Sequence, residues 1–185
     1  MSTLTTTRLT LVPFRDEHLP GLHAMNADPA VMRYLSGRAE TLEETRAMVE
    51  RVKLRWQAVG HSWWSFIDTH SGALIGAGAI QHLRREATAE PDLGCPLEIG
   101  WRLRQDHWGQ GLATEAARAM AAFAFEQLRA PTLLAVCKPD NLASAAVMQR
   151  LGMHNLGLQR WYGQSLATYQ LNAPARQPAC TSGAG

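Results

Sequence analysis

The sequence predicts a mixed α/β fold in which helices flank one central sheet. Segments that alternate apolar and polar residues, as strands do, are interleaved with segments whose apolar residues recur at helical spacing. One short run, Thr132–Lys138, is almost entirely apolar, which is typical of a strand buried on both faces. A length of 185 residues suits one domain with a sizeable core. We therefore expect a single domain over residues 1–172 and a disordered tail over residues 173–185, where the residues are small and polar.

The N-terminal part of the sequence predicts a strand, two short helices and a longer helix. Residues 8–14, RLTLVPF, alternate apolar and polar side chains. The helical pattern that follows is divided at Asp28–Pro29, because proline disfavours helical backbone in the residue before it. The longer helix is expected from Thr41 to Gly60. Thr41 and Glu44 have the spacing of a capping box, and glycine is a common helix stop.

The remaining elements are strands and helices in an order that indicates a mixed sheet. Two strands joined by a turn are followed by a third strand, and two helices then alternate with two further strands. Together with the first strand they predict a twisted central sheet of about six to seven strands. The expected elements are strands within 62–83, a strand at 96–103, a helix at 112–128, a strand at 132–138, a helix at 141–152 and a strand at 165–171.

The composition limits the classes of binding partner and the cellular compartment that we expect for this protein. The formal net charge of +2 gives no general electrostatic reason to expect nucleic acid or an anionic membrane as a partner. No stretch reaches the roughly 20 apolar residues that cross a bilayer, and the N-terminus lacks a signal-peptide pattern. The three cysteines, Cys95, Cys137 and Cys180, form no CxxC pair, and the histidines show no metal-binding spacing. We expect a cytoplasmic protein without a metal site, and a homodimer stays open.

Two glycines stand directly before the alanine-rich helix, in the segment GQGLAT at residues 109–114. The first N–H groups of a helix have no partner within it, and the helix dipole makes that end partly positive. Because glycine lets the backbone approach an anion closely, the segment is a candidate cradle for a diphosphate. A tight turn that requires Gly109 and Gly111 explains these residues equally well. The P-loop pattern does not fit because no lysine follows, and the dinucleotide pattern lacks its third glycine.

Four motifs, taken together and in order, carry a family resemblance. They are RLTLVPF, NADPAVMRYL, EIGWRLRQDHWGQGLATEA and KPDNLASAAVMQRLGM. They resemble the GNAT acetyltransferase superfamily, and within it the RimJ/RimL-like branch of ribosomal-protein N-terminal acetyltransferases, from about Arg8 to Leu171. The resemblance implies the GNAT acyl-CoA N-acyltransferase fold and acetyl-CoA as co-substrate. Asp106 departs from the family's glycine-loop pattern, which often begins with arginine or glutamine, and this removes one candidate side-chain donor.

The resemblance also implies where acetyl-CoA binds. Its pantetheine arm is expected to pair with the main chain of Trp101 and Leu103, much as a peptide adds to a sheet edge. Asn141 and Ser144 are expected to contact the cofactor near this arm, although a helix N-cap is the ordinary role of an asparagine in this place. The pyrophosphate is expected on the main-chain N–H groups of Gly109, Gln110, Gly111, Leu112, Ala113 and Thr114.

For the chemistry, the resemblance implies direct attack of a primary amine on the thioester. Glu98, on the strand beside the cofactor, is the expected general base, with an arginine-paired structural role as the alternative. Ser144 is the first candidate for the acid that protonates the departing thiolate, and Tyr162 is the second. The main-chain amide at Trp101 or close by is expected to hold the thioester oxygen. Cys137 is expected in the core and not as a nucleophile.

The resemblance also implies which segments the acceptor contacts. In this fold the acceptor meets the early helices and the loop between the third and fourth strands, here NADPAVMRYL, Trp63–Trp64 and a loop with Glu86, Glu90 and Asp92. These acidic residues could attract a cationic amine, but a solvated loop explains them more simply. A protein N-terminus, a polyamine and an amino-sugar or antibiotic amine stay open. A non-catalytic acyl-CoA-binding module and, less favoured, a nucleotide-binding oxidoreductase are the alternative functions.

Overall fold

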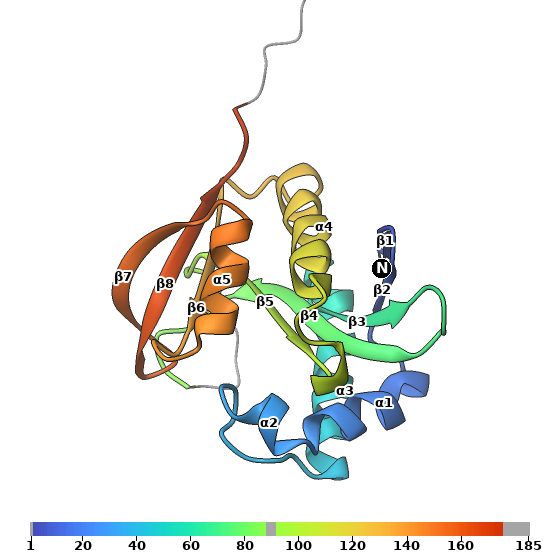
Figure 1. The fold of residues 1–185 in the computed structure, drawn as a ribbon. Helices are drawn as coiled ribbons and strands as arrows, with labels where there is room; N and C mark the ends of the chain where they lie inside the picture. The colour runs from blue at the N-terminus through green and yellow to red at the C-terminus, as the bar shows by residue number, and fades with distance from the viewer. Residues whose placement is uncertain (1, 88–91, 176–185) are drawn as a thin grey trace, which may run out of the picture.

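The computed structural model describes residues 2–87 and 92–175. They form one sheet with strand order β1-β2-β3-β4-β5-β6-β8-β7 (Figure 1). Neighbouring strands are antiparallel except for β5 and β6, which are parallel, so the predicted mixed sheet is confirmed. The strands are β1 (Leu4–Thr5), β2 (Leu9–Pro13), β3 (Trp63–Asp68), β4 (Leu74–His82), β5 (Leu97–Leu103), β6 (Thr132–Cys137), β7 (His154–Trp161) and β8 (Gln164–Asn172).

The described residues form eight strands, more than the six to seven that we expected. β1 is only two residues long. β7 is exposed over most of its length, and its pairing with β8 shifts register between Asn155 and Leu158, where Gly157 takes a φ of 80°. An edge strand with this composition lacks the alternation that identifies strands in a sequence. Residues 176–185 of the expected tail lie outside the described residues.

The helices begin and end close to where the sequence predicts. The capping box of α3 is present, because the Thr41 side chain accepts from Glu44 N at 3.2 Å and Glu44 Oε2 accepts from Thr41 N at 2.8 Å. Gly60 ends this helix with a φ of 74°. Asp28 caps α2 by accepting from Ala30 N at 2.8 Å. The helices are η1 (Asp16–His18), α1 (Leu19–Asn26), α2 (Pro29–Met32), α3 (Leu42–Val59), η2 (Gln105–His107), α4 (Leu112–Glu126) and α5 (Leu142–Arg150).

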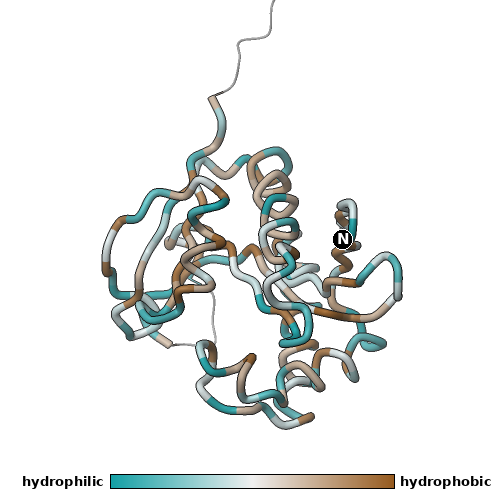
Figure 2. The backbone as a smooth tube through the Cα atoms, in the orientation of Figure 1, coloured by the Kyte–Doolittle hydropathy of each residue, from teal (hydrophilic) through white to brown (hydrophobic). Residues whose placement is uncertain are grey.

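The two faces of the sheet differ in chemistry. One face packs on α4, where a side chain at Gly78 would collide with Met120. The other face meets η1 and α1, where Ser65 Oγ lies 2.9 Å from His18 Nδ1. Figure 2 shows hydrophobic stretches interrupted by more hydrophilic ones along the central strands, and the core that these strands form continues into α4. On the η1 and α1 side, however, β5 presents Glu98, because successive strand residues point to opposite faces.

The parallel strands β5 and β6 separate almost at once. Their pairing consists of Glu98 opposite Leu134, although both strands are longer than this. Arg104 N donates to Ile75 O at 2.8 Å, so even-numbered residues of β5 bond to β4. By the alternation of an antiparallel ladder, the main-chain groups of Trp101 and Leu103 point toward the opening beside β6. α4 and α5 lie side by side, and each follows the C-terminal end of one of these strands (Figure 1).

Candidate active site

The segment before α4 has the geometry of an anion cradle. Gly109 and Gly111 take φ values of 73° and 77°, in the left-handed region that glycine adopts most easily. Gly111 is the N-cap residue of α4, and no side chain caps the helix there. Thr114, in the first turn of α4, has a buried hydroxyl without a hydrogen-bond partner within residues 2–87 and 92–175. The N–H groups at this helix end, together with that hydroxyl, fit an anionic ligand.

Hydrogen bonds of Thr6 and Arg8 to Gln110 and Glu115 hold the segment before α4 in place. We call this set of contacts the brace, and the sequence analysis missed it. Arg8 donates through Nε to Glu115 Oε2 at 2.7 Å and through Nη1 to the carbonyl oxygen of Gln110 at 2.9 Å. Glu115 Oε1 accepts from Thr6 Oγ1 at 2.7 Å and from Arg8 N at 2.8 Å. Although partial burial raises it, these hydrogen bonds hold the pKa of Glu115 below its ordinary value. Arg8 and Glu115 both belong to the quoted motifs, but nothing in the sequence pairs them.

The brace predicts a measurable loss when Glu115 is replaced. Glu115→Gln removes the charge from an ion pair in which the partner nitrogen of Arg8 lies 2.7 Å from the carboxylate. We expect acetyl-CoA affinity to fall several-fold, because the cradle loses its fixed position, while the free energy of unfolding falls by about 1 kcal/mol or less since the pair is partly exposed. Calorimetric titration and thermal unfolding measure the two effects. An unchanged affinity would show that the brace is purely structural.

The side of β5 that faces β6, where the two strands have separated, partly fits the expected site of the pantetheine arm. Trp101 and Leu103 both direct main-chain groups toward the opening beside β6, because the even-numbered residues of β5 bond to β4. The carbonyl oxygen of Leu103, however, accepts from the indole Nε1 of Trp108 at 2.9 Å. The Leu103 N–H and the main chain of Trp101 are therefore the groups that this contact leaves for a ligand.

A polar network surrounds Glu98 at the start of the opening. Glu98 is 8% exposed, and its Oε1 accepts from Gln81 Nε2 at 2.7 Å and from the Tyr162 hydroxyl. Gln81 Oε1 in turn accepts from the indole Nε1 of Trp63 at 3.1 Å. Because an indole N–H can only donate, it fixes the Gln81 amide with its NH₂ group toward Glu98. Both hydrogen bonds reach the same carboxylate oxygen, Oε1.

Burial changes the acid–base properties of this network. Burial raises the pKa of Glu98 above its ordinary value, although the bonds from Gln81 and Tyr162 and the charge of Arg84 oppose the shift. Burial, together with the neighbouring Glu98 carboxylate, raises the pKa of the Tyr162 hydroxyl strongly. Tyr162 also has a φ of 53°, an uncommon backbone conformation for a bulky residue. A strained residue beside a carboxylate of raised pKa is typical of a functional site.

The sequence placed Glu98 and Tyr162 in the site separately, and the structure brings them into contact. Glu98 lies on β5, in the middle of the sheet and not at its edge, where it accepts from Gln81 and Tyr162 and where the charge of Arg84 acts on it. Gln81 was missed. A glutamine ending the otherwise small and apolar strand GALIGAGAIQ was the available signal, but only the β4–β5 register places it opposite Glu98.

Asn141 and Ser144 lie at the start of α5, on the β6 side of the opening. Asn141 is the N-cap residue, and its Oδ1 accepts from Ser144 N at 3.2 Å. Ser144 is partly buried in the first turn of the helix. Next to them, the Tyr34 hydroxyl lies 3.4 Å from the carbonyl oxygen of Asp140 and so links the segment after α2 to the loop before α5.

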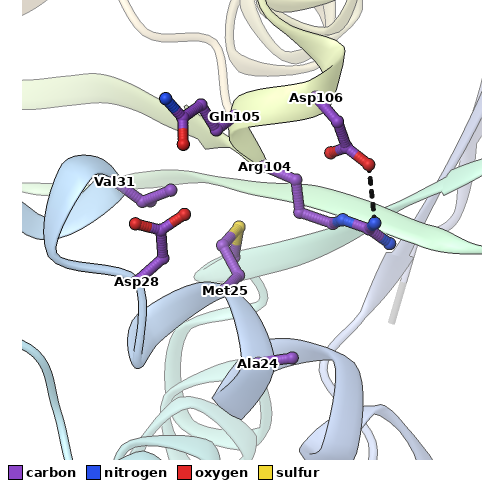
Figure 3. A pocket seen from close by; sticks show the side chains of 7 residues that line it. All are labelled: Ala24, Met25, Asp28, Val31, Arg104, Gln105 and Asp106. Atoms are coloured by element: carbon purple, nitrogen blue, oxygen red, sulfur yellow. Dashed lines mark hydrogen bonds and ion pairs between the residues drawn. The ribbon is translucent and has the colours of Figure 1, made fainter.

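A cleft of about 580 Å³ lies between the early helices and the segment that follows β5. Figure 3 shows Met25 and Asp28 of the helical side facing Gln105 and Arg104, with Arg104 paired to Asp106 at 2.7 Å. This cleft contains part of the motif NADPAVMRYL, which the sequence analysis assigned to the acceptor side. Its lining residues are Ala24, Met25, Asp28, Val31, Arg104, Gln105 and Asp106.

The remaining expectations concern Cys137, the acidic loop, metal ligands and membrane-spanning helices. Cys137 is buried in the core, and burial raises the pKa of its thiol, so a nucleophilic role has no support. In the acidic loop, Glu86 Oε1 lies 3.4 Å from Arg160 Nη2. Glu90 of the same loop lies outside the described residues, and so does Cys180. No three His, Cys, Asp or Glu side chains in the described ranges gather as metal ligands. Within those ranges, every helix is too short or too polar to cross a bilayer.

In this mixed α/β fold, the opening between β5 and β6 adjoins the end of α4 that Gly109 and Gly111 precede. Residues 8–154 match the family model described as acetyltransferase (GNAT) domain, and the chain therefore belongs to the GNAT acetyltransferase family. Relatives of this chain are named N-acetyltransferases. One is YnaD of Bacillus subtilis, 28% identical over 156 residues, which cover 83% of this chain and 84% of the relative.

Solved structures agree with the family assignment. An acetyltransferase of Agrobacterium tumefaciens is 31% identical, with a TM-score of 0.76 over 93% of this chain and 95% of that one. RimL, a ribosomal L7/L12 α-N-protein acetyltransferase solved in complex with coenzyme A, has a TM-score of 0.73 over 92% of this chain and 98% of its own. Its identity is 20%, so this likeness shows the fold alone. The predicted GNAT family and fold are confirmed.

Proposed function

We propose that this enzyme transfers the acetyl group of acetyl-CoA to a primary amine by direct attack of the amine on the thioester. The observation that carries the proposal is the opening between β5 and β6. It begins at Glu98, runs past the main-chain groups of Trp101, and adjoins the uncapped front of α4. A slender ligand with a phosphate group at one end fits such a path.

Acetyl-CoA supplies the activated acetyl group when it is bound. The main-chain N–H groups of residues 109–114 would hold its pyrophosphate, since neither the glycines nor the first turn of α4 supply a competing side-chain cap. The Thr114 hydroxyl would add a donor. The β5 edge at Trp101 and Leu103 would hold the arm, with Asn141 and Ser144 on the opposite side of the opening. The RimL structure with coenzyme A supports this assignment by analogy of fold.

The residues around the opening account for the proton transfers. The amine nitrogen forms a bond to the thioester carbon as the carbon–sulfur bond breaks. Glu98 takes the proton that the amine loses, and its raised pKa makes it a stronger base than an exposed glutamate. The sulfur receives a proton from Ser144, the first candidate. Tyr162 is less suited to that role, because its own pKa is raised and its hydroxyl donates to Glu98.

Two substitutions separate these roles. Ser144→Ala is expected to lower kcat about tenfold or more and to lower the affinity for acetyl-CoA by a smaller factor, because the hydroxyl is both the proposed proton donor and a neighbour of the arm. Tyr162→Phe is expected to lower kcat less and to shift the pH profile, because it removes a hydrogen bond to Glu98. Steady-state kinetics from pH 5 to 9 measures both. Full activity in Ser144→Ala would remove Ser144 from the mechanism.

The proposal as a whole is tested by binding and by thiol release. Calorimetric titration should show that acetyl-CoA binds, and a coupled assay should detect free thiol when peptides, amino acids, polyamines or aminoglycosides are added. No binding at millimolar acetyl-CoA would reject the proposal. Binding without thiol release over the whole panel would instead favour a non-catalytic acyl-CoA-binding module.

A further inference from the structure

A buried arginine lies on the same strand and the same face as Glu98. Arg102 is 9% exposed, two same-face positions beyond Glu98 along β5. Its guanidinium carbon lies 4.6 Å from the centre of the Trp63 ring. The one hydrogen bond of its side chain among the described residues is from Nη2 to the Met48 sulfur, at 3.5 Å. The Nε atom is buried and has no hydrogen-bond partner in the part of the chain that the structure describes.

This guanidinium has no anionic partner in contact with it within the described chain. Burial lowers the pKa of Arg102 to about 10, and Glu40 is the acidic group that opposes the shift. Glu40 itself accepts from Asn26 Nδ2 at 2.9 Å. A buried charge without a hydrogen-bonded counter-ion is costly, so proteins rarely retain one without a reason. An anionic ligand would supply the missing counter-ion.

Gly100, the residue between Glu98 and Arg102 on this face of β5, borders open space. A side chain added at Gly100 would meet nothing within 4 Å, whereas at Gly78 it would collide with Phe66, Met120 and the main chain. Packing therefore requires Gly78 and does not require Gly100. Trp63 lies in the same row of the sheet as Gly100, with Ala79 between them, so the open space is bounded by small residues and an aromatic ring.

We propose that the acceptor is a small amine that carries a carboxylate, of amino-acid type, with its carboxylate on Arg102 and its amine facing Glu98 across Gly100. This inference rests on the proposed acetyl transfer and names its substrate class. Arginine binds carboxylates through two parallel hydrogen bonds, and a partly desolvated site strengthens them. A polyamine would bring a second positive charge toward Arg102, and a peptide N-terminus has no carboxylate next to its amine.

Matched acceptor pairs test the proposal. With the wild-type enzyme, amino acids should be acetylated with a kcat/KM at least tenfold above that of their carboxamides, and polyamines should be poorer still. Arg102→Gln should abolish this preference, and Arg102→Lys should restore part of it. The Tm of Arg102→Gln should not fall, since an unpaired buried charge is removed, and its acetyl-CoA affinity should be that of the wild type. Equal use of carboxamides, or a preference that survives in Arg102→Gln, would overturn the inference.

A binding measurement keeps this test separate from acetyl transfer itself. Saturation-transfer NMR on the complex with coenzyme A should detect amino acids, and the signal should weaken with carboxamides and in Arg102→Gln. Failure of every amine to release thiol would count against the proposed function, while Arg102-dependent binding would still support the carboxylate site. Equal binding of amino acids and carboxamides would contradict it, whatever the turnover.

Gly100→Ala gives an independent check on the same space. The methyl group enters the acceptor side of the strand, so the acceptor KM should rise severalfold while acetyl-CoA affinity is unchanged. The Tm should stay the same or rise, because alanine replaces a glycine in a strand without a clash. Gly78→Ala is the matched control, and it should lower the Tm. An unchanged acceptor KM in Gly100→Ala would place the acceptor elsewhere.

Discussion

Glu98→Gln is expected to lower kcat by about 10²- to 10⁴-fold, the usual contribution of a general base. The replacement is nearly isosteric. Its amide oxygen can still accept from Gln81 and Tyr162, which both bond to the same carboxylate oxygen in the native protein. The change therefore removes basicity with little loss of packing. Acetyl-CoA affinity, measured by calorimetry, should stay within a few-fold of the wild type.

The stability of Glu98→Gln provides the control. Burial raises the folded-state pKa of Glu98, so its favourable contribution is fully present below the unfolded pKa and is lost as the pH rises through the folded value. Glutamine does not lose a proton there. At neutral pH the variant should thus have a Tm equal to or above the wild type, and its rate profile should lack the lower ionisation. A folded variant that keeps the wild-type kcat would contradict the assigned role, whereas a lowered Tm would contradict the predicted stability.

Gly109→Ala is expected to weaken acetyl-CoA binding about tenfold or more. The added methyl group projects from the segment that is proposed to hold the pyrophosphate, and the left-handed backbone at φ +73° resists a side chain. Loss of one charge-assisted hydrogen bond is enough to account for such a factor. Calorimetric titration of acetyl-CoA measures it.

Gly72→Ala is a closely matched control. Gly72 has a φ of +70° and open space around it, as Gly109 does, but it lies in the turn between β3 and β4. Both variants should lose about 1–2 kcal/mol of stability, the cost of a left-handed alanine. Only Gly109→Ala should lose affinity. Equal acetyl-CoA affinities in the two variants would show that the glycine segment is merely a turn.

Local signals in the sequence predicted much of the fold. The capping pair Thr41 and Glu44, the stop at Gly60 and the cap at Asp28 act within a few residues, so their pattern is readable in one dimension. β7 was missed because it lies at the sheet edge, where exposure removes the alternation that burial imposes on other strands.

Local sequence patterns could not predict the contacts that organise the site, because these contacts join residues far apart in the sequence. Arg8 and Glu115 are 107 residues apart, and Tyr162 and Glu98 are 64 apart. The family resemblance indicated Glu98 and Tyr162 singly, but strand register and the turn after β7 bring them together. Arg102 carried no signal at all, because an arginine in an alternating strand is ordinarily read as exposed.

The central claim is that free main-chain N–H groups at the front of α4 and on the open edge of β5 bind acetyl-CoA. Amide NMR of ¹⁵N-labelled protein, titrated with coenzyme A and with pantetheine, which lacks the phosphates, tests it most directly. Coenzyme A should shift the amide signals of Gly109–Thr114 and of Trp101 and Leu103, whereas pantetheine should shift only the β5 signals. If coenzyme A leaves the Gly109–Thr114 amides unmoved while others shift, the account is wrong.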